Sequence, residues 1–255
     1  MLEVLNVGIV GYGYASATFH APLVARTRGL KLAAVASHDA AKVRRDWPDI
    51  PVEPTPEALF SRANLDLVVI ATPNDTHHDL ASRALAAGKH VVVDKPFTVT
   101  LGEAEALKAQ AEAAGLTLSV FHNRRWDSDF LTLREVLAEG ALGRIVHVES
   151  HFDRYRPVVR DRWRERAGSG TGLWYDLGPH LLDQALLLFG RPEGFTLDLA
   201  VQREGAVVDD WFHAVLRYGP LRVVLHAACL TPEPAPRFTV HGERGTFIKR
   251  GLDPQ

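Results

Sequence analysis

The chain as far as His122 alternates short apolar runs with helical patterns, and this alternation restricts the possible folds strongly. The apolar runs lie at Leu5–Val10, Lys31–Ala36, Leu65–Ala71, His90–Val93 and Leu116–Phe121. Helical patterns separate them, among them Ser16–Arg28, Asp75–Ala87 and Thr100–Ala114. Continuous apolar strands that alternate with helices are typical of a parallel sheet covered on both faces. This part is therefore predicted to be α/β, a doubly wound parallel sheet.

The pattern changes after His122. Helical patterns at Asp127–Glu139 and Asp176–Phe189 flank a long strand pattern at Ile145–Tyr155. Four strand-like segments then follow one another, TLDLAVQR, DWFHAVLRY, LRVVLHAACL and RFTVHG. Strands that follow strands favour antiparallel pairing. We expect an α+β domain with an open, mostly antiparallel sheet.

The composition excludes several classes of protein. Lys and Arg number 29 and Asp and Glu 31, so the formal charge of −2 gives no global attraction to nucleic acid or to a membrane surface. A single cysteine, Cys229, excludes an intramolecular disulfide and fits a reducing compartment. No stretch approaches the roughly 20 apolar residues of a membrane span, and the first residues lack the basic region of a signal peptide. We expect a cytoplasmic protein with neither nucleic acid nor membrane as a partner.

A glycine-rich turn stands where the first strand should lead into the first helix. Gly11 permits a tight turn, Gly13 lets the backbone approach a pyrophosphate, and Ser16 is small enough for close packing of helix on strand. Such a turn places phosphate charge at a helix N-terminus. We therefore predict a Rossmann NAD(P)-binding domain at residues 1–122 and a second, substrate-binding and oligomerisation domain at residues 123–255.

The end of the second strand bears on the choice of cofactor. An acidic residue there would accept hydrogen bonds from an NAD ribose, but Ser37 takes the place, followed by His38 and Lys42. A hydroxyl and nearby cations suit a 2′-phosphate, so NADP(H) is favoured over NAD(H). Asp39 leaves the alternative open, since it either binds a ribose or caps the following helix.

Two further groups suggest catalysis. Asp94-Lys95-Pro96 ends a buried parallel strand, where the carboxyl ends of strands face a ligand. Asp176 and His180 lie four residues apart, which places both on one face of a helix. A carboxylate beside an imidazole can orient a general base, although Asp176 as a helix cap and His180 as a packed histidine explain the spacing equally well.

Several short segments together carry a family resemblance. They are the glycine turn, A-T-P-N-x-x-H at Ala71–His77, D-K-P at Asp94–Pro96 and D-x-x-x-H at Asp176–His180. The chain resembles the Gfo/Idh/MocA family of NAD(P)-dependent sugar and polyol oxidoreductases. Further segments resemble the branch with the NADP-dependent scyllo-inositol dehydrogenases: F-H-A-P at Phe19–Pro22, S-V-F-H-N-R-R-W-D at Ser119–Asp127, D-F-L-T at Asp129–Thr132, R-Y-R-P at Arg154–Pro157, R-W-R-E at Arg162–Glu165, L-W-Y-D-L-G-P-H at Leu173–His180 and L-D-P-Q at Leu252–Gln255.

The resemblance implies an oxidoreductase that transfers a hydride between a secondary alcohol of a polyol or sugar and a nicotinamide cofactor. It implies a homo-oligomer, with Lys95, Asp176 and His180 catalytic. Tyr155 and Trp163 are expected to be walls of the substrate pocket. The residues expected at the cofactor are Gly11, Tyr12, Gly13, Ser16, Ser37, His38, Lys42, Thr72, Pro73, Asn74, His77, Asp94, Lys95, Asn123 and Arg125.

The chain departs from the family at its C-terminus. Family members normally continue well past L-D-P-Q, so we expect the second domain to be incomplete at its C-terminus. Two alternatives to the dehydrogenase stay open: a nucleotide-binding protein without turnover, as a sensor or a decayed truncated homologue, and an NAD-assisted glycosidase.

Three polar residues of one strand raise the question of a metal site. His147, Glu149 and His151 alternate along a predicted strand and so share a face. No second cluster at a recognised spacing accompanies them. We interpret the three residues as polar positions on an exposed strand face and predict no metal.

Overall fold

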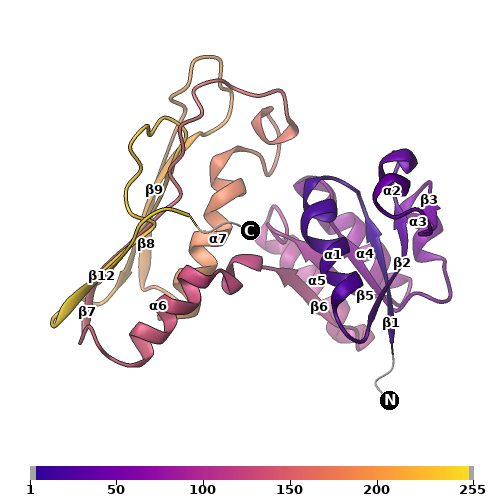
Figure 1. The fold of residues 1–255 in the computed structure, drawn as a ribbon, viewed down its shortest axis with the longest axis horizontal. Helices are drawn as coiled ribbons and strands as arrows, with labels where there is room; N and C mark the ends of the chain where they lie inside the picture. The colour runs from indigo at the N-terminus through magenta and orange to yellow at the C-terminus, as the bar shows by residue number, and fades with distance from the viewer. Residues whose placement is uncertain (1–3, 253–255) are drawn as a thin grey trace. The chain divides into compact units, whose positions relative to one another are not determined.

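The fold is taken from a computed structural model, which describes residues 4–252. Of the L-D-P-Q segment, Asp253–Gln255 lie outside the described residues. Contacts within the chain divide it into two compact units, and the boundary along the sequence lies between Phe121 and His122. Figure 1 shows the elements of both units, and each unit is described separately below.

The first unit is built on a six-stranded sheet in the order β3-β2-β1-β4-β5-β6. All neighbouring strands are parallel. This is the strand order of dinucleotide-binding folds, in which ligands bind beyond the carboxyl ends of the strands where the order reverses, here β1 and β4. The predicted doubly wound sheet is confirmed. Its strands are β1 (Leu5–Val10), β2 (Leu30–Ala36), β3 (Val52–Glu53), β4 (Leu67–Ile70), β5 (His90–Asp94) and β6 (Leu118–Phe121).

Helices cover both faces of this sheet. Side chains of α1 and α2 join one buried apolar cluster, and those of α3, α4 and α5 join the cluster on the opposite face. Thr100 and Glu103 form the expected capping box at the start of α5, and Gly115 ends that helix in the left-handed conformation. The helical segments are η1 (Ser16–His20), α1 (Ala21–Arg26), α2 (Ala40–Asp46), α3 (Pro56–Phe60), η2 (Asn74–Thr76), α4 (His77–Ala86) and α5 (Leu101–Ala114).

The second unit is built on a mixed sheet in the order β12-β11-β7-β10-β9-β8. Only β7 and β10 pair in parallel among its described strands; the other neighbours are antiparallel, as predicted. The strands are β7 (Ile145–His151), β8 (Gly194–Ala200), β9 (Trp211–Tyr218), β10 (Leu221–Ala228), β11 (Phe238–Gly242) and β12 (Gly245–Lys249). Its helical segments are η3 (Asn123–Trp126), α6 (Ser128–Ala138), η4 (Trp163–Glu165) and α7 (Gly172–Phe189).

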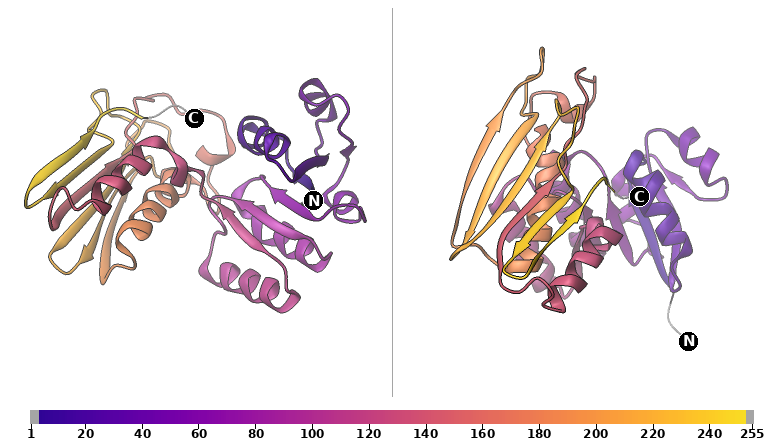
Figure 2. Two further views of the ribbon diagram at one scale, coloured as in Figure 1. Left: turned by 60° about the horizontal axis from the view of Figure 1, so that its bottom comes forward. Right: turned by 60° about the vertical axis from the view of Figure 1, so that its left-hand side comes forward.

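One face of the second sheet carries the core. Figure 2 shows α6 and α7 lying along that face. Phe130 of α6, Leu181 of α7 and Phe212 of β9 are all fully buried there in one apolar cluster. The opposite face carries polar side chains, among them several histidines. No helix of the part that the structure describes is long and apolar enough to cross a membrane.

The helix α7 begins a turn earlier than its sequence pattern predicts. Asp209, from the segment before β9, accepts hydrogen bonds from the first helical amides: its carbonyl from Leu173 N at 2.8 Å and its carboxylate from Trp174 N at 2.6 Å. A cap supplied from a distant part of the chain satisfies amides that would otherwise lack partners. No local pattern near Gly172 predicts this cap.

The position of the core predicts that truncating two phenylalanines of the same sheet has very different effects on the free energy of unfolding. Phe212 is fully buried and meets Trp174 edge-on at 5.1 Å, whereas Phe195 on β8 is 64% exposed. We expect Phe212→Ala to lower the free energy of unfolding by about 3–5 kcal/mol, because it leaves a cavity. Phe195→Ala should change it by less than about 0.5 kcal/mol. Urea unfolding followed by fluorescence measures both, and equal losses would contradict the assigned core.

Candidate functional site

The glycine turn lies at the carboxyl ends of β1 and β4. Gly11 has a φ of +87°, and a Cβ on it would lie 2.6 Å from the carbonyl oxygen of Ala71. Both facts require glycine at this position. At Gly13, by contrast, a Cβ would meet no atom within 4 Å, so the backbone there borders open space. Ser16 is buried, and its hydroxyl donates to the carbonyl oxygen of Gly11 at 2.7 Å.

Tyr12 belongs to the core of the first unit. The residue is only 6% exposed, and its hydroxyl donates to Asp46 Oδ2 at 3.1 Å. Burial, with the hydrogen bond and charge of Asp46, raises the pKa of Tyr12. The side chain of Tyr12 therefore anchors the turn to α2, and the part of Tyr12 left to meet a cofactor is its backbone.

The end of β2 shows how Asp39 is used. Its carboxylate accepts a hydrogen bond from Lys42 N at 3.0 Å and so caps α2. Its amide donates to Ser37 Oγ at 3.1 Å. His38 is exposed, and the Lys42 ammonium lies 5.9 Å from the centre of the Tyr12 ring. Of the two roles left open for Asp39, ribose binding and helix capping, the structure shows the helix cap.

The loop after β4 is held by hydrogen bonds within the first unit. Thr72 and Thr76 share a hydroxyl hydrogen bond at 2.6 Å, Pro73 is exposed and Asn74 is buried. His77 is fully buried; its Nδ1 lies 2.8 Å from the Pro96 carbonyl oxygen and its Nε2 3.0 Å from that of Thr72. His77 thus ties the loop after β4 to the loop after β5.

Asp94 is the last residue of β5, beside a buried histidine, and Lys95 follows it. Asp94 Oδ1 accepts from Lys95 N at 2.7 Å, and Asp94 Oδ2 lies 3.4 Å from His20 Nε2. His20 is 3% exposed and packs its ring 4.3 Å from that of Phe121. Burial pushes the pKa of Asp94 upward, but the hydrogen bond and charge of His20, with Lys95, hold it below its usual range. An ionised carboxylate is therefore fixed next to Lys95.

The second group of predicted residues lies on α7. His180 is buried, with its ring edge-on to Phe152 at 6.4 Å. Asp176, one turn before it, lies with Oδ1 3.3 Å from Arg164 Nε of η4. Between them, a Cβ on Gly178 would lie 2.5 Å from the Trp174 ring, so glycine lets this ring lie along the helix.

Arg125 is committed to an ion pair in the second unit. It donates from Nε and Nη2 to the two carboxylate oxygens of Asp183, at 2.7 and 2.6 Å. This bidentate pair fastens η3 to α7 at Asp183, which is three residues beyond His180. The hydrogen bond and charge of Asp183 raise the pKa of Arg125. Asn123 lies in the same short helix η3.

The two predicted pocket walls differ in their surroundings. Tyr155 is 60% exposed and pairs through its backbone with Leu230. Trp163 begins η4, and the Arg164 guanidinium lies 4.4 Å from the centre of its ring.

A buried ionic network holds η4 in place. Glu165 accepts from Arg160 N at 3.0 Å and from Arg162 Nε at 2.6 Å, and lies 3.1 Å from Arg203 Nη1. Arg203 also donates to Asp210 at 2.9 Å. Burial raises the pKa of Glu165, yet these hydrogen bonds and charges bring it below its usual value.

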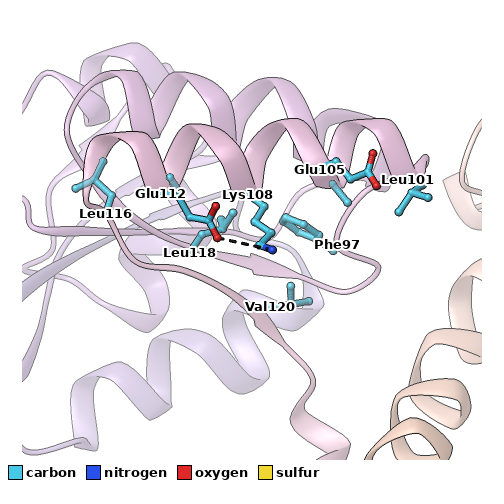
Figure 3. Close-up of a pocket in the computed structure, with 10 residues that line it drawn as sticks. Phe97, Leu101, Glu105, Lys108, Glu112, Leu116, Leu118 and Val120 are labelled. Atoms are coloured by element: carbon cyan, nitrogen blue, oxygen red, sulfur yellow. Dashed lines mark ion pairs between the residues drawn. The ribbon is translucent and has the colours of Figure 1, made fainter. Parts of the chain in front are cut away.

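A separate groove of about 530 Å³ lies on the first unit between α5 and β6. Figure 3 shows its apolar walls, which include Phe97, Leu116 and Leu118, with the Lys108–Glu112 ion pair at its rim. None of the residues predicted at the cofactor or substrate lines this groove.

Three residues near the predicted sites were missed by reasoning from the residues themselves. His20 appears only within the F-H-A-P segment, and Asp209 carries no local signal, since its partners are distant in the chain. Only the helical spacing from His180 to Asp183 could have indicated that Asp183 lies on the same side of α7.

The comparisons with known proteins agree over the whole chain. The family model "Oxidoreductase family, NAD-binding Rossmann fold" matches residues 5–122, and "GFO/IDH/MocA C-terminal domain" matches residues 130–248. The uncharacterized oxidoreductase YdgJ of Escherichia coli K12 is 59% identical over 255 residues, which are 100% of this chain and 74% of YdgJ. The scyllo-inositol 2-dehydrogenase (NADP(+)) IolW of Bacillus subtilis 168 is 41% identical over 254 residues, 100% of this chain and 71% of IolW.

A solved structure shows the same fold. The Yersinia pestis protein YPO2259 is 61% identical, with a TM-score of 0.94 over 100% of this chain and 72% of that one.

The Glu165 network predicts an acid-sensitive contribution to stability. Because the pKa of Glu165 is lower in the folded chain, its contribution is complete above the unfolded value of about 4.3 and is lost as the pH falls through the folded value. Glu165→Gln should lower the free energy of unfolding by about 1–3 kcal/mol near neutral pH, and the deficit should shrink below about pH 4.

Urea unfolding of both proteins across this pH range measures the effect, with Glu233→Gln at an exposed position as the matched control. A deficit that does not change with pH would show that the charge of Glu165 is not what stabilises η4.

Proposed function

The chain belongs to the GFO/IDH/MocA oxidoreductase family, and we propose that it transfers a hydride between a secondary alcohol of a polyol or sugar and NADP(H). The observation that carries the proposal is the glycine turn at the reversal point of the parallel sheet. Gly11 is pressed against the Ala71 carbonyl, and Gly13 faces open space.

The residues present fit a dinucleotide. A side chain at Gly13 would fill the space that a pyrophosphate needs, and the helical segment Ser16–Arg26 starts directly beyond it. Thr72, Pro73 and Asn74 follow β4 at the neighbouring strand end, where the nicotinamide half of the cofactor would run. The first unit is thus proposed to bind the cofactor, and the second to bind the substrate and to form the oligomer.

The preference for NADP(H) rests on charge at the end of β2. The Asp39 carboxylate caps α2 through Oδ1, so part of its accepting capacity is already used. Ser37 offers a hydroxyl, His38 is exposed, and the Lys42 ammonium lies 5.9 Å from the centre of the Tyr12 ring. A 2′-phosphate needs donors and positive charge, which this set provides. The similar enzyme IolW carries NADP(+) in its name, which supports the same choice.

The catalytic roles follow from the chemistry of the side chains. When bound, the nicotinamide accepts or supplies the hydride. His180 takes the hydroxyl proton of the alcohol during oxidation and returns it during reduction. Lys95 stabilises the negative charge that develops on the alcohol oxygen.

Each catalytic group has a neighbour that holds it. Asp176 lies one helical turn before His180, on the same face of α7, where a carboxylate can orient an imidazole. Asp94 accepts from the backbone amide of Lys95, and His20 fixes this carboxylate. Arg125 holds η3 against α7 through Asp183. Tyr155 and Trp163 offer ring faces and edges to a hydroxylated substrate, and IolW suggests an inositol.

The cofactor preference can be tested by placing a negative charge at the end of β2. Ser37→Glu should weaken NADPH binding by about tenfold or more, because a carboxylate repels the 2′-phosphate, and should affect NADH much less. Titration by cofactor fluorescence measures both affinities. Ser61→Glu, at an exposed site at the end of α3, is the matched control. An unchanged ratio of NADPH to NADH affinity would refute the assignment.

The catalytic roles predict that removing His180 lowers turnover while cofactor binding is kept. His180→Ala should lower kcat by about 10²–10⁴-fold with inositols or hexoses as substrates, and Lys95→Met by at least as much. NADPH affinity should change little in His180→Ala, and His78→Ala should keep full turnover. A chain that binds NADPH but turns over none of these alcohols would favour the binding protein without turnover.

A further inference from the structure

The face of the second sheet opposite α6 and α7 carries three histidines side by side. His213 on β9 pairs in register with His226 on β10, and His226 pairs with His151 on β7. The rings of His226 and His213 lie 5.7 Å apart, and those of His226 and His151 lie 5.2 Å apart. The parallel pairing of β7 with β10 brings together residues that are far apart in the sequence.

Asp153 lies between two of these histidines. Its Oδ2 is 3.3 Å from His151 Nδ1, and its Oδ1 is 3.4 Å from His226 Nε2. The Asp153 side chain is only 3% exposed, and Oδ1 is buried without a hydrogen bond. A buried carboxylate oxygen without a hydrogen bond is costly, and a bound cation would remove that cost.

The geometry points to a divalent transition-metal site formed by His151, Asp153 and His226. One ligand atom from each residue lies within 4.8 Å of the other two. Metal–ligand bonds of about 2.1 Å in a tetrahedron place ligand atoms about 3.4 Å apart. The two separations at Asp153, one at each carboxylate oxygen, are close to that value, and the three ligand atoms would draw together from within 4.8 Å to bind the metal.

The neighbouring residue Glu149 supports this arrangement. Its Oε2 lies 3.0 Å from His151 Nε2, on the side of the ring away from Asp153. If His151 binds the metal through Nδ1, its Nε2–H donates to Glu149. A carboxylate in this position fixes the ring orientation and strengthens the imidazole as a ligand.

A cavity of about 220 Å³ gives access to the site. His151 and Asp153 line it, together with Pro234, Arg237 and Arg250. Three protein ligands leave a fourth position for water or an anion, and this cavity has room for one.

The ligand set selects a class of metal. Two imidazoles and one carboxylate suit Zn²⁺, Co²⁺ or Ni²⁺, whereas Mg²⁺ and Ca²⁺ prefer oxygen ligands alone. His147, Glu149 and His151 alternate along β7, and of these three only His151 is a ligand of the proposed site. His147 contacts Glu149 at 3.0 Å and stacks on His241, away from Asp153.

Calorimetric titration of the untagged, EDTA-treated chain with ZnCl₂ and CoCl₂ tests the site, without nicotinamide cofactor. We expect one saturable equivalent per chain and visible absorption bands from four-coordinate Co²⁺. Asp153→Asn and His226→Ala should each weaken binding by more than about tenfold, and Glu149→Gln by about 10–100-fold.

His241→Ala, on the same sheet face but outside the cluster, is the matched control and should bind as the unmodified chain does. Circular dichroism confirms that each variant is folded, and Asp153→Asn keeps the shape of the side chain. Absence of a saturable equivalent in the unmodified chain, or equal weakening in His241→Ala, would overturn the site. Because no cofactor is present, the result is independent of the proposed oxidoreductase reaction.

Discussion

The close contact between Gly11 and the carbonyl of Ala71 is the constraint on which the first unit depends. It brings together the ends of β1 and β4 at the point where the strand order reverses, and Gly11 N also donates to the Ala36 carbonyl at the end of β2. A side chain at Gly11 would force these strand ends apart. The left-handed turn then directs the chain past Gly13 into the helix, where Ser16 bonds back to Gly11. The open space before Gly13 is a consequence of this packing.

The second unit depends on buried polar contacts around α7. Arg237 donates to Ser150 on β7 and to Gln184 on α7, and its guanidinium lies 4.0 Å from the centre of the Phe152 ring. Gln184 in turn donates to the Arg124 carbonyl of η3. Because these buried groups are hydrogen-bonded to one another, they fix the position of the helix that carries His180. Removing one of them would leave the others buried without partners.

Local signals in the sequence were enough to predict the elements that have strong patterns. The apolar strands, the capping box at Thr100 and the glycine turn were all found in this way, and together they define the parallel sheet. The short elements β3 and α3 were not predicted, since two to five residues show no periodicity. The ion pair of Arg125 with Asp183 and the cluster of Asp153 with His226 depend on tertiary packing. Spacing along the chain cannot reveal such pairs.

The central claim is that the strand ends around the glycine turn bind a nicotinamide dinucleotide. Hydrogen exchange of backbone amides, measured with and without saturating NADPH, tests it most directly. We expect slower exchange at residues 11–16, 37–42 and 72–77, because a bound pyrophosphate and ribose phosphate would cover these segments. Exchange that is unchanged there, or protection confined to other parts of the chain, would contradict it.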